Sequence, residues 1–242
     1  SDDLATSVRR GLEQWAHGAT SHPARTVQWV ESADEAQIAV SLAPLAAADG
    51  PATIAERYYA VVAPFDTLTD GVSLDDLSQR WLGLSSIGIL YVTQESEGAL
   101  RALLGDVAHA AEVVPADDML ARLLERRDAL GVLPFERLDP RFKALTVDGA
   151  NVLSNTLDPA AYPLAVAVVA SGPGAPEALD ALRTAVAPTN RDASRLTTLI
   201  MTGVTAMSRL TAARMEAMGY TYPAEIIADT LSAADITHVS NE

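Results

Sequence analysis

Arg57-Tyr-Tyr-Ala-Val-Val-Ala-Pro-Phe65 decides the fold class, because it is the strongest strand signal in the chain. Aromatic and β-branched residues favour strands, and proline is tolerated where a strand ends. The next element is a helix, which Ser73-Leu-Asp-Asp76 opens as a variant of the capping box, with Leu74, Leu77 and Trp81 facing inward. A strand followed by a helix is the repeating unit of the α/β class.

The same alternation extends on both sides of this segment, to about residue 190. Helices are expected from the face formed by Leu4, Val8, Leu12 and Trp15 and at 97–104, 117–130 and 176–186, with glycines 105 and 131 as C-caps. Strands are expected at 26–30, 37–42, 57–65, 87–92, 111–114, 131–135, 142–147 and 162–170. The order predicts an α/β fold with mostly parallel sheets.

A separate segment, residues 195–242, follows the alternating region. Arg195-Leu-Thr-Thr-Leu-Ile-Met-Thr-Gly203 is typical of a buried parallel strand. A helix at 206–218, a short helix from Pro223 and a strand at 235–240 complete a β-α-β crossover. Because such a crossover has an open edge, we expect further strands in a longer protein.

Composition narrows the possible partners. The 32 acidic residues outnumber the 17 lysines and arginines and give a net charge of −15, which argues against nucleic acid and anionic membranes as partners. No apolar run reaches the length of a membrane span, so we expect no direct membrane insertion of this chain. The absence of cysteine excludes disulfides, zinc–thiolate sites and thiol catalysis.

Motifs for catalysis are weak. The histidines at 17, 22, 109 and 238 show neither HExxH nor HxH spacing, so they predict no metal site. Gly172-Pro-Gly174 lacks the Lys-Ser/Thr of a phosphate-binding loop and is typical of a turn. We therefore expect no catalytic residue, no metal and no cofactor in this chain. These weak motifs favour a chain that is not itself an enzyme.

Two stretches carry a resemblance to a known family. Residues 58–81, with a strand, a proline, a loop and Ser73-Leu-Asp-Asp-Leu77, look like the phosphate-binding branch of the type II periplasmic binding proteins where the chain enters the second lobe. Gly131-Val-Leu-Pro-Phe135 and Phe142-Lys-Ala-Leu-Thr-Val-Asp-Gly149 look like the return strands. The match spans roughly residues 1–172, although the family's first strand should precede the first helix.

The resemblance implies two lobes within a module of residues 1–190. Lobe 1 would comprise 1–64 and 142–190, and lobe 2 would comprise 65–141. Crossing segments are expected near 62–65 and 134–142, without one continuous sheet through both lobes. The export signal of such an extracytoplasmic protein would be absent from this chain.

In this fold a ligand lies between the lobes, at strand ends and helix N-termini. The expected ligand-binding residues lie at the ends of two expected strands. Asp66, Thr67, Thr69 and Asp70 follow the strand at 57–65, Ser85 and Ser86 precede the strand at 87–92, and Thr93 and Ser96 follow it. Each of these has an alternative role as a turn former or helix cap. The 66–70 loop holds two acids and no base, which favours a neutral or cationic ligand over phosphate. Tyr58 and Tyr59 face opposite sides of their strand, so one is expected in the core and the other could line the cleft.

The C-terminal segment carries a second resemblance. Thr202-Gly-Val-Thr-Ala-Met-Ser-Arg209 and Ser232-Ala-Ala-Asp-Ile-Thr-His-Val-Ser-Asn-Glu242 look like the start of the CapA family of capsule or poly-γ-glutamate synthesis, which has a metallophosphoesterase-like fold. Val204 stands where that family has its first metal-binding aspartate.

Together these observations predict a non-catalytic, extracytoplasmic, solute-binding-like module that recognises a small molecule or a cell-envelope polymer. The alternative is a part of a CapA-like synthesis protein or metal-dependent hydrolase whose active site lies beyond residue 242. A third possibility is a purely structural domain with a closed cleft.

Overall fold

The computed structural model describes residues 3–18, 26–30, 32–48, 50–84, 88–106 and 111–241. The chain divides into two compact units, the first formed by residues 1–153 and 157–191 and the second by 154–156 and 192–242. The helices of the first unit are α1 (Leu4–Gly18), α2 (Leu74–Trp81), α3 (Gln94–Leu104), α4 (Met119–Glu125) and α5 (Ala175–Ala185). Its strands are β1 (Ala39–Pro44), β2 (Thr53–Pro64), β3 (Gly71–Val72), β4 (Leu90–Val92), β5 (Glu112–Val113), β6 (Leu130–Pro134), β7 (Phe142–Val147) and β8 (Ala165–Ser171).

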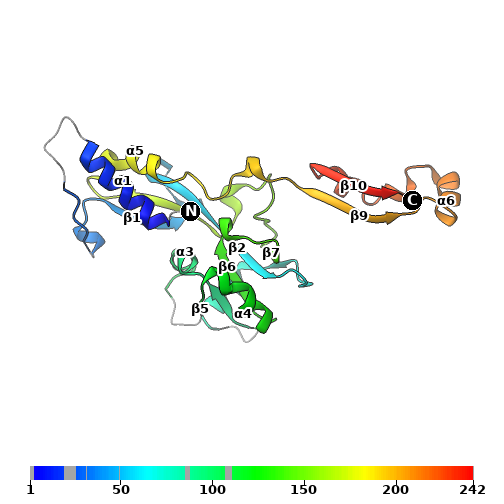
Figure 1. Ribbon diagram of the computed structural model, residues 1–242, viewed down its shortest axis with the longest axis horizontal. Helices are drawn as coiled ribbons and strands as arrows, with labels where there is room; N and C mark the ends of the chain where they lie inside the picture. The colour runs from blue at the N-terminus through cyan, green and yellow to red at the C-terminus, as the bar shows by residue number, and fades with distance from the viewer. Residues whose placement is uncertain are drawn as a thin grey trace. The chain divides into compact units, whose positions relative to one another are not determined.

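The long strand β2 organises the first unit. Its first half, Thr53–Tyr58, pairs antiparallel with β8, whose other edge pairs antiparallel with β1. Its second half pairs antiparallel with β6 at Tyr59–Val62 and with β7 at Val61–Pro64. Strands β4 and β5 continue from β6 in parallel, which gives the order β1-β8-β2-β6-β4-β5. Figure 1 shows α1 and α5 beside β1 toward one end of β2, and α4, β5 and β6 toward the other.

Each half of β2 has its own apolar core. Around the first half, α1 and α5 pack on β2 and β8 through side chains that include Val8, Leu12, Ile54, Val168 and Leu182. Around the second half, α2, α3 and α4 pack on β2, β4 and β6 through side chains that include Trp81, Leu90, Leu100, Leu123 and Leu133. Burial of apolar surface is the dominant favourable term in folding, so each half has its own source of stability.

The structure confirms the α/β class and corrects three expectations. The sheet is not mostly parallel, because every strand that pairs with β2 runs antiparallel to it. One sheet path joins β8 to β4, because the twelve residues of β2 are long enough to pair with both groups of strands. Residues 26–30 form no strand. The residue boundaries of the two lobes stay a prediction.

The two expected glycine caps differ in outcome. Gly105 ends α3 with a φ of +88°, as a C-cap glycine does. Gly131 instead lies inside β6, where a Cβ would come within 2.7 Å of Met119 Sδ and 3.0 Å of Val62 Cγ2. Its role is close packing of α4 against the sheet.

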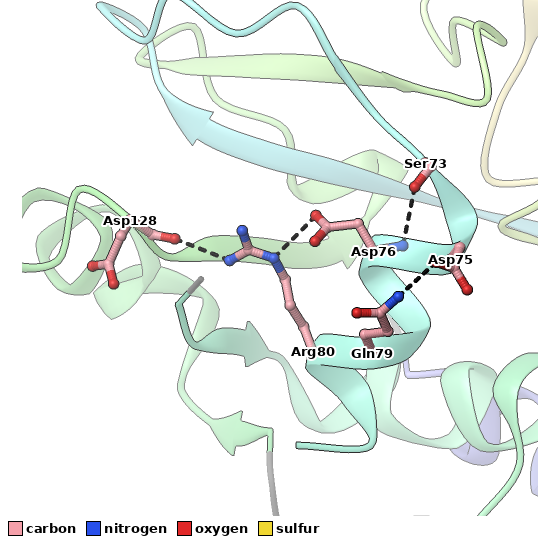
Figure 2. A network of polar contacts seen from close by, with 6 residues as sticks. All are labelled: Ser73, Asp75, Asp76, Gln79, Arg80 and Asp128. Carbon is pink, nitrogen blue, oxygen red and sulfur yellow. Dashed lines mark hydrogen bonds and ion pairs between the residues drawn. The ribbon is translucent and has the colours of Figure 1, made fainter. Parts of the chain in front are cut away.

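Helix α2 is fixed by a polar network that Figure 2 shows. Ser73 caps the helix by accepting from the amide of Asp76, as its sequence predicted. The side chain of Arg80 is 6% exposed; its Nε donates to Asp76 Oδ2 at 3.1 Å and its Nη1 donates to the carbonyl of Asp128 at 2.9 Å. The second bond ties α2 to the turn that leads into β6.

The second unit is the expected β-α-β crossover. Its elements are β9 (Leu199–Thr205), α6 (Leu210–Met218), the 3₁₀ turn Tyr222–Ala224, α7 (Ala228–Ser232) and β10 (Ile236–Asn241). Strands β9 and β10 pair in parallel, with a shift of register between His238 and Ser240. The expectation of a buried strand was wrong, because Leu199, Met201 and Val204 of β9 are all exposed. A sheet of two strands offers too little cover to bury them.

Candidate ligand-binding site

The loop from Asp66 to Asp70 is held by bases that come from elsewhere in the sequence. Asp66 Oδ1 lies 2.6 Å from Arg127 Nη1. Asp70 Oδ1 lies 2.6 Å from Lys143 Nζ, which also donates to the carbonyl of Thr67 at 2.8 Å. The reasoning that no base could neutralise an anion at this loop was therefore incomplete. Thr69 is exposed, and no contact of its side chain stands out.

Thr93 and Ser96 form the start of α3. Thr93 is the N-cap, and its hydroxyl accepts from the amide of Ser96 at 3.2 Å and contacts Ser96 Oγ at 2.8 Å. Both side chains are buried. Their hydroxyls thus serve the helix cap, which was the alternative role for Ser96. Ser85 and Ser86 lie outside the described residues.

The structure does not bring the 66–70 loop and the start of α3 together. Because β2 runs antiparallel to β6, its end lies beside the beginning of β6, where Arg127 meets Asp66. Strand β4 runs parallel to β6, and the amide of Thr93 donates to the carbonyl of Val132 near the end of β6. The two groups therefore lie at opposite ends of β6, and one small ligand could not touch both.

A hollow of about 350 Å³ opens at the carboxyl ends of β4 and β5. Its lining comes from the start of α3, the segment after β5 and the turn after β6: Gln94, Glu95, Val113, Val114, Pro115, Ala116, Asp117 and Arg137. Within this lining, Glu95 Oε1 and Arg137 Nη2 form an ion pair at 3.9 Å. The first amide groups of α3 have no acceptor within the helix, so this end can receive a negative group.

Beside this hollow, β2 contributes Arg57 and Tyr59, which alternation places on one face of the strand. Tyr59 is 4% exposed, and no hydrogen-bond partner of its hydroxyl lies among the residues that the structure describes. Burial raises the pKa of Tyr59 to about 12, and the charge of Glu136 adds to the rise. Burial lowers the pKa of the Arg57 guanidinium, against the attraction of Glu136. Arg57 and Tyr59 are therefore both partly or fully buried and both lie within the electrostatic influence of Glu136.

The opposite face of β2 is closed. Tyr58 Oη donates to Glu56 Oε2 at 2.7 Å, and the ring packs near Tyr162 and under the guanidinium of Arg191. Burial raises the pKa of Tyr58. Both tyrosines are thus core residues, and they differ in that the Tyr58 hydroxyl is bonded to Glu56 whereas the Tyr59 hydroxyl has no such partner among the described residues.

Asn190 connects the two faces of the site. Its Oδ1 accepts from the amide of Tyr58 at 2.8 Å, and its Nδ2 donates to the carbonyl of Tyr58 at 3.0 Å. The same Nδ2 donates to Glu136 Oε2 at 2.6 Å. The carboxylate of Glu136 is therefore held by a neutral amide, and its charge acts on the Arg57 guanidinium.

No protein-family model matches the chain, and no curated protein matches it. Among solved structures, an ABC-type phosphate transport receptor from Vibrio cholerae is 20% identical with a TM-score of 0.50, covering 68% of this chain and 83% of that one. PstS from Borrelia burgdorferi is 9% identical with a TM-score of 0.49, covering 73% and 89%. The chain has the fold of a substrate-binding protein. At these identities the likeness concerns the fold alone.

Sequence reasoning missed most of the residues around the hollow. Arg57, Glu95, Glu136, Arg137 and Asn190 are spread over 130 residues and form no motif. The signal that was available was the tyrosine pair on β2, together with the rule that ligands bind at the carboxyl ends of parallel strands. Strands β4, β5 and β6 are parallel to one another, so the rule applies to their carboxyl ends, as it does to the short parallel pair of β3 and β7.

Proposed function

We propose that the first unit is a non-catalytic solute-binding module that acts outside the cytoplasmic membrane and recognises a small molecule or a short piece of a cell-envelope polymer. The observation that carries the proposal is the hollow at the carboxyl ends of β4 and β5, with the start of α3 on one wall and Tyr59 beside it. The fold, which is that of a phosphate transport receptor, supports it. No helix among the described residues is long and apolar enough to cross a membrane.

The chemistry of the site suits binding better than turnover. The acids and bases around the hollow are mostly exposed, and none is paired with a buried nucleophile in the way that covalent catalysis requires. Small-molecule sites combine an apolar wall with a few polar groups that fix orientation. Val113, Val114 and Pro115 supply the wall, Glu95 is a polar group of the lining, and the charges of Glu95, Arg57 and Glu136 all act on the neighbouring Tyr59.

The test is a binding screen of the purified chain against phosphate, sulfate, sugars, amino acids and short cell-envelope polymer fragments. Thermal shift would identify candidates, and calorimetry would give the stoichiometry. We expect one solute to bind at one per chain and to lose at least tenfold in affinity in Arg57→Met. Binding to none of these classes, or binding that the Arg57 variant leaves unchanged, would contradict the proposal.

The alternative proposal is that the second unit begins a CapA-like domain of a synthesis protein or metal-dependent hydrolase. The parallel pairing of β9 and β10 around two helices favours it. Within the described residues, no cluster of three or more His, Asp or Glu side chains is placed to hold a metal ion. Stoichiometric binding of manganese or zinc with phosphodiesterase turnover would favour this alternative over the first proposal.

A further inference from the structure

Arg57 makes no direct ion pair among the described residues, although the charge of Glu136 acts on it. Arg57 is half-buried on β2, and its one hydrogen bond among the described residues runs from Nη1 to the carbonyl of Glu56 at 2.7 Å. A guanidinium has five N–H donors, so most of its capacity is unused. Burying a charge without a partner is costly, and a carboxylate matches the planar fork of arginine. Arg57 is therefore placed to receive a carboxylate.

Two glutamates of the site, Glu136 and Glu95, lack a close ion pair. Glu136 is held by the neutral amide of Asn190, which leaves its second carboxylate oxygen open. Glu95 has only a loose ion pair with Arg137, at 3.9 Å. Both glutamates lie close enough to Tyr59 for their charges to act on its phenol, as does Arg57. The charges of Arg57, Glu136 and Glu95 thus all act on the same phenol.

A single anion fits this arrangement poorly. A phosphate that approached Arg57 and the start of α3 would also meet the exposed carboxylates of Glu95 and Asp117 in the lining and of Glu136 nearby, and like charges repel. A single cation would bring no acceptor to the remaining N–H donors of Arg57. A ligand with one group of each sign satisfies both sets of charges, and its carbon chain can lie on Val113 and Pro115.

We propose, on the basis of the solute-binding function above, that this site binds a small zwitterion that carries one carboxylate and one ammonium group. The carboxylate binds Arg57 and the first amide groups of α3. The ammonium binds Glu136 and Glu95, and Tyr59 donates its hydroxyl to the carboxylate. An occupant of amino-acid size fits the hollow of about 350 Å³.

The test uses the full chain and a series of ω-amino acids, from glycine to 6-aminohexanoate, which vary the spacing of the two charges. The matched half-ligands are propionate, which has only the carboxylate, and ethylammonium, which has only the ammonium. Inorganic phosphate is the third probe. Calorimetry should give at least one ω-amino acid an affinity tenfold or more above both half-ligands and above phosphate.

Two isosteric substitutions, combined in one variant, locate the ammonium site. Glu136→Gln combined with Glu95→Gln should weaken the best ω-amino acid at least tenfold while propionate binds as well as before or better. The control is Glu97→Gln, which removes the same charge from the first turn of α3, where Glu97 pairs with Arg101. It should leave the affinity unchanged. Circular dichroism checks that each variant folds.

Several results would overturn the zwitterion proposal. These are phosphate binding as tightly as the best ω-amino acid, half-ligands binding equally well, an equal loss in the Glu97 control, or no ω-amino acid binding at all. If phosphate or a sugar binds while the zwitterions do not, the solute-binding function stands and only this inference fails. If no solute of any class binds, both fail.

Discussion

Arg80 offers the sharpest test of how the first unit is held together. We predict that Arg80→Met destabilises the unit by about 2–4 kcal/mol, because the change removes two hydrogen bonds of a buried charge and leaves Asp76 and the Asp128 carbonyl without their donor. The upper end of the range is limited because Asp76 is 28% exposed and water can partly replace the guanidinium. Methionine retains much of the side-chain volume, so little of the loss is due to packing.

The chain supplies a matched control in Arg101. Arg101 also pairs with an acid four residues earlier, Glu97 Oε1 at 2.7 Å, but its side chain is 52% exposed. Exposed ion pairs contribute little to stability. We therefore expect Arg101→Met to unfold at the same denaturant concentration as the wild type, within error. The contrast isolates burial and the bond to Asp128, since both pairs have the same spacing.

The assay is urea unfolding followed by tryptophan fluorescence. All three tryptophans lie in the first unit, and Trp81 is buried beside Arg80 with its Nε1 bonded to the carbonyl of Gly105 at 3.0 Å. The expected loss corresponds to a fall of roughly 5–15 °C in melting temperature for a unit of this size. Equal losses in the Arg80 and Arg101 variants would refute the reasoning. A double-mutant cycle with Asp76→Asn separates the ion pair from the bond to Asp128.

Three further predictions address the backbone, the pH response and the first loop. Gly88→Ala should destabilise the first unit by about 2 kcal/mol or more, because Gly88 has a positive φ and an added Cβ would collide with the Asp128 carbonyl. The control is Gly50→Ala, whose Cβ would meet nothing within 4 Å, and it should unfold like the wild type. The folded state favours the neutral phenol of Tyr59, so its contribution to stability should be complete below about pH 10 and disappear as the pH rises through about 12. In Tyr59→Phe the free energy of unfolding should therefore fall less steeply with pH over this range. An unchanged slope of unfolding free energy against pH would contradict the assignment. Asp66→Asn with Asp70→Asn should change neither ligand preference nor melting temperature appreciably, since both acids are exposed and lie at the far end of β6; altered ligand selectivity in calorimetry would restore the loop to the binding site.

The sequence predicted the elements better than their directions. Residues 142–147 were expected as a strand and form β7, and the helix expected at 176–186 is α5, shifted by one residue. Hydrophobic periodicity reports which face of an element is buried, and this is the same for parallel and antiparallel strands. Nothing in Arg57–Phe65 therefore indicated that β2 would run against all of its partners.

The site was harder to predict because charge compensation is non-local. The 66–70 loop is acidic in sequence, yet its two acids pair in space with Arg127 and Lys143, which lie 61 residues after Asp66 and 73 residues after Asp70. Thr93 and Ser96 were plausible ligand contacts, but a hydroxyl before a helix has a nearer use as its cap. Tyr59 could be singled out in sequence only as one member of a pair, because both rings are buried and the contacts that engage Tyr58 come from Glu56, Tyr162 and Arg191.

The position of the site along β2 follows from its partners. Strand β2 pairs with β8 up to Tyr58 and with β6 from Tyr59 onward, so the change of partner falls between the two tyrosines. At this point Asn190 replaces a neighbouring strand by bonding both backbone groups of Tyr58, and it also holds Glu136 beside Tyr59. A ligand bound to Glu136 would thus be one hydrogen bond away from Asn190, which fixes the middle of β2. Because Asn190 lies two residues before the second unit begins, the segment that leads into that unit is anchored at the same point.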